Sequence, residues 1–136
     1  MIFAVAASVL IVAGVATWLM LHRQGQQMVR VVVDLRDRSM ARGTEPYPTE
    51  PPLEIPHKVS SLEIYLPLGS GDGPYDVRIA AGNGHVLSSS RGVAGLKAGV
   101  TSLHVDVNLP STSPGLYALE IRKAGSEWSS YPMRIQ

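Results

Sequence analysis

At 136 residues, the chain has room for one domain and an appendage. Its 12 basic and 11 acidic residues nearly cancel, so no bulk positive field is available to draw the chain to nucleic acid. The chain contains no cysteine, which excludes disulfides, thiolate metal sites and cysteine nucleophiles and leaves the redox compartment undecided.

The first segment, 2–21 (IFAVAASVLIVAGVATWLML), carries no charge. Twenty residues of helix span about 30 Å, the thickness of the hydrocarbon core of a bilayer. Trp18 lies near the end of the segment, where an indole ring prefers the membrane interface, and His22 and Arg23 follow it. We therefore predict a transmembrane helix over 1–22 that contacts lipid through 2–21. A cleaved signal peptide is disfavoured, because the segment lacks a basic start and a small-residue cleavage site.

A basic collar follows the predicted span. Between 23 and 42, five arginines accompany two aspartates, which gives a local charge of +3, whereas 44–136 carries seven basic and nine acidic residues. Such a collar fits anionic lipid headgroups and fits the solvated end of a strand equally well. Taken literally, the positive-inside rule would keep this flank in the cytoplasm.

From Val29 onward, apolar and polar residues alternate in short runs, as is typical of half-buried strands. Between the first two runs, 39–56 contains five prolines and is expected to be an extended arm that forms few hydrogen bonds. The segment GNGH, 82–85, is typical of a hairpin turn. The pattern predicts strands at 29–35, 61–68, 75–81, 103–109, 116–122 and 128–136, with weaker short strands at 86–90 and 92–96.

Seven or eight short strands without an amphipathic helix predict an all-β fold. The economical arrangement is an immunoglobulin-like sandwich of two packed antiparallel sheets, which would occupy 23–136 and include the proline-rich arm.

A cluster of charged residues follows the first predicted strand. Asp34, Arg36 and Arg38 alternate along one face, so Asp34 can pair with Arg36, while Arg38 and Arg42 stay available for the proline-rich arm or for lipid. One interpretation is that these charges mark the exit of a strand into water. The other is a structural latch, in which the four residues pin the arm to the sandwich.

The sequence predicts no catalytic, cofactor-binding or metal-binding set. His104 and Asp106 share one face of a strand and His85 occupies a turn, but a His-x-Asp pair is ordinary on a polar strand face. A Ser-His-Asp triad lacks the nucleophile elbow that would support it. Two aromatic residues, Tyr65 and Trp128, are predicted surface contacts, whereas Tyr131 shares its register with apolar residues and belongs to the core.

The span and the phrases that follow it resemble the extracytoplasmic part of bacterial anti-sigma-factor-like membrane proteins. The phrases are VVVDLRDRSMARGTEP, PPLEIP, SLEIYLPLGS, YDVRIA and PGLYALEIRKAGSEWSSYPMRI. In that family, a cytoplasmic zinc-finger domain grips a sigma factor, and one transmembrane helix joins it to a β-sandwich outside. The zinc ligands have no counterpart in this chain, so we expect the cytoplasmic head to be missing here. The resemblance does imply the topology, with 23–136 in the periplasm.

The resemblance therefore predicts a non-enzymatic sensory or structural part of an anti-sigma-like regulator, anchored in the bacterial cell membrane and using no cofactor. A second hypothesis is an anchored adhesion or assembly module, which would pair with an unknown protein or with its own copies through exposed strand edges. A third is a carbohydrate-binding sandwich, and a fourth is a small hydrolase.

Overall fold

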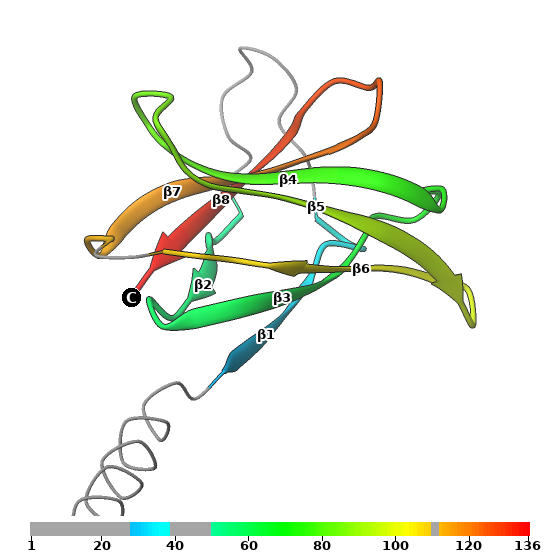
Figure 1. Cartoon of the computed structure of the whole chain (residues 1–136), viewed down its shortest axis with the longest axis horizontal. Coiled ribbons are helices and arrows are strands. Elements are labelled where there is room, and N and C mark those ends of the chain that lie inside the picture. Colours follow the sequence, from blue (N-terminus) through cyan, green and yellow to red (C-terminus); the bar gives the residue numbers. More distant parts are fainter. Residues whose placement is uncertain (1–27, 39–49, 110–111) are drawn as a thin grey trace, which may run out of the picture.

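The computed structural model describes residues 28–38, 50–109 and 112–136. Within these ranges the chain forms eight strands and no helix (Figure 1), so the predicted all-β fold class is confirmed. The strands are β1 (Val29–Asp34), β2 (Leu53–Ile55), β3 (Val59–Tyr65), β4 (Gly73–Ala81), β5 (Val86–Lys97), β6 (Val100–Asp106), β7 (Gly115–Lys123) and β8 (Ser129–Ile135).

The predicted transmembrane helix, 1–22, lies outside the described residues, as do Arg42 and most of the proline-rich arm. In the part of the chain that the structure describes, no helix has both the length and the apolar character needed to cross a membrane. The membrane anchor therefore stays a prediction from the sequence.

All eight strands belong to one mixed sheet, in the order β1-β3-β6-β5-β4-β7-β8-β2. The six inner strands pair antiparallel, but the two edge strands do not: β1 runs parallel to β3, and β2 runs parallel to β8. The predicted purely antiparallel pairing is wrong at these edges. A tight hairpin fixes antiparallel pairing, and no hairpin joins either edge strand to its neighbour in the sheet.

The sheet folds into two layers because β5 belongs to both of them (Figure 1). The first part of β5 pairs with β4 as far as Ala94, and its last residues, Gly95–Lys97, pair with β6. The two weak strands predicted at 86–90 and 92–96 are therefore one continuous strand. The core lies between the layers, where the inward positions of the alternating pattern are buried.

Most inward positions follow the predicted register, including Leu103, Val105 and Val107 on β6 and its extension. Two positions that the alternation places outward are also buried, Ala80 on β4 and Ala118 on β7, which stand opposite each other in the β4–β7 ladder. Ala81, which the alternation places inward, is only partly buried. The pairing of β4 with β5 shifts by one residue between Ile79 and Ala80. The extra residue is Leu87 on β5, and the pairing of β4 with β7 stays regular at this point.

The end of the proline-rich arm is more ordered than its composition indicates. Leu53–Ile55 forms β2, whose Leu53 and Ile55 are buried and whose Glu54 is exposed. The Gln136 N–H also donates to the Ile55 carbonyl at 3.0 Å. Three residues between prolines thus supply enough apolar surface to cap the edge of β8.

A close backbone approach at Gly92 brings the two layers together. A Cβ atom at this position would lie 2.6 Å from the His104 carbonyl oxygen on β6 and 2.8 Å from a methyl carbon of Leu103. Nearby, the Ser90 hydroxyl donates to the Asp106 carbonyl. Only glycine lets β5 lie this close to β6 without displacing backbone.

We expect Gly92→Ala to lower the free energy of unfolding by about 1–3 kcal/mol, because the added methyl group meets a backbone oxygen that cannot rotate away. The matched control is Gly95→Ala on the same strand, where no atom lies within 4 Å of the added Cβ. Denaturant unfolding of both variants measures the difference. Equal stability of the two variants would contradict this account of the β5–β6 contact.

Candidate functional site

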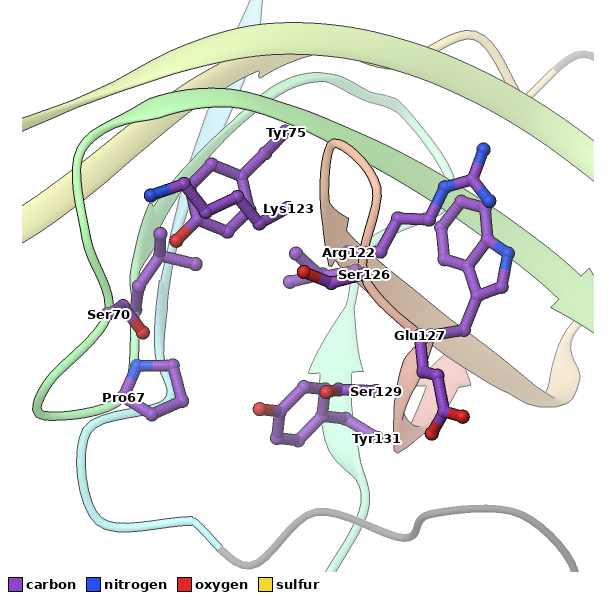
Figure 2. A pocket seen from close by; sticks show the side chains of 12 residues that line it. Pro67, Ser70, Tyr75, Arg122, Lys123, Ser126, Glu127, Ser129 and Tyr131 are labelled. Carbon is purple, nitrogen blue, oxygen red and sulfur yellow. The ribbon is translucent and has the colours of Figure 1, made fainter.

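A pocket of about 380 Å³ opens at one end of the two-layered domain (Figure 2). Four segments enclose it: the connection from β3 to β4, the start of β4, the end of β7, and the turn that leads into β8. Each segment contributes because strands of both layers end here. The residues that line the pocket are Leu66, Pro67, Ser70, Tyr75, Ile121, Arg122, Lys123, Ser126, Glu127, Trp128, Ser129 and Tyr131.

The floor of the pocket is apolar and aromatic. Leu66, Tyr75, Ile121 and Tyr131 are all buried, since each occupies an inward position of its strand or of the strand's extension. The prediction that Tyr131 belongs to the core is confirmed. A ligand that enters the pocket would therefore meet side chains that are already packed.

The β3–β4 connection, which forms one wall, is held by three hydrogen bonds. The Thr101 hydroxyl donates to the Ser70 carbonyl at 2.9 Å, and the Tyr75 hydroxyl donates to the Gly71 carbonyl at 2.8 Å. Within the connection, the Ser70 N–H donates to the Pro67 carbonyl at 3.0 Å. Burial raises the pKa of Tyr75 above its usual value, so its hydroxyl keeps the donated proton at neutral pH.

The rim of the pocket carries charges of both signs. The Lys123 ammonium lies against the β3–β4 connection, 2.7 Å from the place that a Cβ of Gly71 would occupy. Glu127 lies elsewhere on the rim, in the turn after β7, and Figure 2 shows the pocket between the two side chains. Neither has an ion-pair partner in the described ranges. Both charges are therefore available to a ligand.

Trp128, a predicted surface contact, is only partly exposed because two guanidinium groups cover its ring. Those of Arg78 and Arg122 lie 4.1 and 4.5 Å from the ring centre. Both arginines also form ion pairs, Arg78 with Glu120 and Arg122 with Asp76. Through these contacts Trp128 attaches the turn at the pocket rim to the outer face of β4 and β7.

Tyr65, the other predicted surface contact, does not line this pocket. It borders a shallower hollow on the outer face of β3, where the Arg36 guanidinium lies 5.5 Å from its ring centre. The two aromatic residues therefore do not combine into one platform for a sugar.

Three of the four residues of the predicted latch, Asp34, Arg36 and Arg38, lie in the described part of the chain. Asp34 accepts a hydrogen bond from the Arg36 Nε at 2.9 Å, and Arg38 donates to the Pro51 carbonyl, just before β2, at 2.5 Å. Arg42 lies outside the described residues. Only the Arg38 contact joins the end of β1 to the start of β2, and the role of the set as a latch stays a prediction.

The outer face of β6 carries the His-x-Asp pair noted in the sequence. The ring of His104 lies 3.5 Å from a Glu63 carboxylate oxygen and 3.7 Å from one of Asp106. Among the described residues, no group of three or more His, Asp and Glu side chains is arranged to hold a metal ion.

The sequence did not reveal the pocket, because its walls come from four segments that only the fold brings together. The one local signal was the polar residues of two turns, Ser70 in the first and Ser126 with Glu127 in the second. Such residues are usual in turns of every kind, so they carried no prediction.

Hydrogen bonds from Arg36 lower the pKa of Asp34 from 3.8 to about 2. Because the pKa is lower in the folded chain, the pair stabilises the fold above pH 3.8, and this contribution is lost as the pH falls toward 2.

We expect Arg36→Gln to return the pKa of Asp34 toward 3.8, as measured by NMR titration of the carboxyl group. Arg38→Gln is the control, since Arg38 bonds to Pro51, and a similar shift in both variants would contradict the assignment.

Comparison of the chain with protein-family models, with curated proteins and with solved structures found no match. The resemblance to anti-sigma-factor-like membrane proteins therefore stays a prediction from the sequence. What the pocket can bind has to be inferred from its own geometry.

Proposed function

We propose that residues 23–136 form the extracytoplasmic sensory part of a membrane-anchored regulator similar to the anti-sigma-factor-like membrane proteins. In this proposal, 2–21 anchors the chain in the bacterial cell membrane, and the domain recognises a ligand or partner without catalysing a reaction. A ligand can shift the state of such a domain only by its difference in affinity for two states. A preformed pocket and a firm connection to the anchor are the features that such a role requires.

The observation that carries the proposal is the position of β1. This strand follows the apolar segment within a few residues of sequence, and it pairs with β3 along its whole length. Val33 and Leu35 at its end are buried in the core, and the Leu35 N–H donates to the Tyr65 carbonyl at 2.9 Å. A change in the core would thus reach the strand that continues toward the predicted anchor.

The same proposal includes an immunoglobulin-like architecture. What supports it is the distribution of strands between the layers: β3 and β6 lie in one, and β4, β7 and β8 lie in the other. This division matches the B and E strands against the C, F and G strands of immunoglobulin domains. The chain departs from that pattern in its two parallel edge strands, β1 and β2, and in β5, which pairs with strands of both layers.

A second candidate function, an anchored assembly module, is favoured by the free edge of β1. This strand ends the sheet, so its second edge has no partner strand in the described part of the chain. Val32 in its middle is 57% exposed, and Met28 just before it is 87% exposed. Exposed edges of this kind can pair with a strand of another chain.

We expect a Lys58→Cys variant to react with a membrane-impermeant maleimide on intact cells, because Lys58 lies in the exposed turn before β3. The chain has no native cysteine, so the label reports one position. Leu62→Cys is the matched control: Leu62 is fully buried and should react only after denaturation. Labelling of Lys58→Cys only after cell lysis would overturn the extracytoplasmic placement, and release of the chain from membranes by salt would overturn the anchor.

A further inference from the structure

We propose that the pocket at the end of the domain binds a small zwitterion that carries an apolar side chain, such as a dipeptide of apolar amino acids. In this arrangement Lys123 pairs with the ligand's carboxylate and Glu127 with its ammonium group. The inference rests on the proposed sensory function and gives that function a chemical class of ligand.

The size and floor of the pocket select for a small ligand with an apolar part. A volume of about 380 Å³ is near the lower end of the range for small-molecule sites. Four buried side chains, those of Leu66, Tyr75, Ile121 and Tyr131, form the floor. An apolar side chain placed on this floor leaves water without exposing any new polar group.

The rim selects for opposite charges. Lys123 and Glu127 border the pocket in different places (Figure 2), and neither has an ion-pair partner among the described residues. The third charged side chain at the rim, Arg122, is held by Asp76 at 3.0 Å and by the ring of Trp128. One cation and one anion therefore remain for a ligand, and a zwitterion satisfies both.

The pocket is also organised before any ligand binds. Its wall is fixed by the hydrogen bonds that Thr101 and Tyr75 donate to the β3–β4 connection. Its rim is fixed by the contact of Trp128 with two arginines. Few side chains or loops then have to be ordered when a ligand binds, so the entropy cost of binding a small molecule is low.

A neutral saccharide fits these observations less well. Saccharides stack a ring on an exposed aromatic face, but the Trp128 ring is already in contact with Arg78 and Arg122, and Tyr131 is buried. A saccharide would also leave the two rim charges without partners of opposite sign. Saccharide binding is therefore an outcome that the experiment tests against the zwitterion.

The test is isothermal titration calorimetry of the full chain in detergent micelles, with L-leucyl-L-leucine as the probe. We expect Lys123→Gln and Glu127→Gln each to weaken binding by about two- to fivefold, the range for loss of one exposed ion pair. L-leucyl-L-leucinamide, which lacks the carboxylate, should lose affinity with Glu127→Gln but be unaffected by Lys123→Gln. The N-acetylated dipeptide should show the reverse pattern.

Lys58→Gln is the matched control, because it removes an exposed lysine that does not line the pocket. The inference is overturned if the dipeptide does not bind, or if glycylglycine binds as tightly as the dipeptide. It is also overturned if maltose binds and both rim variants leave the affinity for maltose unchanged. The result is independent of the maleimide labelling. Dipeptide binding by a chain that labels only after lysis would keep the ligand assignment and overturn the proposed location.

Discussion

The close approach of β5 to β6 at Gly92 is the constraint on which the two-layered structure depends. Stacked sheets ordinarily lie about 10 Å apart, and a strand that serves both of them has to cross that distance within a few residues. At Gly92 the absence of a side chain lets the β5 backbone contact the β6 backbone. The hydrogen bond from the Ser90 hydroxyl to the Asp106 carbonyl stabilises this contact between the two strands. Gly92 also stands opposite Tyr75 in the β4–β5 ladder. The same contact that folds the sheet therefore positions part of the pocket floor.

The opposite side of the domain is closed by different means, because the sheet ends there in β1 and β2. No ladder joins these two edge strands, yet Arg38 beyond β1 bonds to the Pro51 carbonyl before β2. One hydrogen bond from an exposed arginine stabilises little by itself, and the burial of Val33, Leu35, Leu53 and Ile55 contributes far more. The Arg38–Pro51 hydrogen bond thus brings the end of β1 and the start of β2 together but contributes little to their stability.

The parts of this structure that could be predicted from the sequence are those that local pattern decides. Period-two alternation identified the strands and the inward residues, and spacing alone placed Asp34 beside Arg36. Two features escaped this approach for physical reasons. Prolines concealed β2, whose short run of Leu53 and Ile55 is stable only against β8. The pocket escaped because it depends on where strand ends from both layers meet, which no single segment encodes.

The outer face of the second layer explains how the pocket keeps its shape. In the β4 ladder, Asp76 stands opposite Arg91 on one side and Arg122 on the other, and both arginines lower the pKa of its carboxyl. The Arg122 guanidinium also lies over the ring of Trp128, the residue that follows Glu127 in the sequence, and both residues line the pocket. Exposed ion pairs of this kind stabilise the fold only slightly. Their shared consequence is geometric: these contacts connect β5, β4, β7 and the turn before β8 in one row, and β4 also carries Tyr75 of the pocket floor.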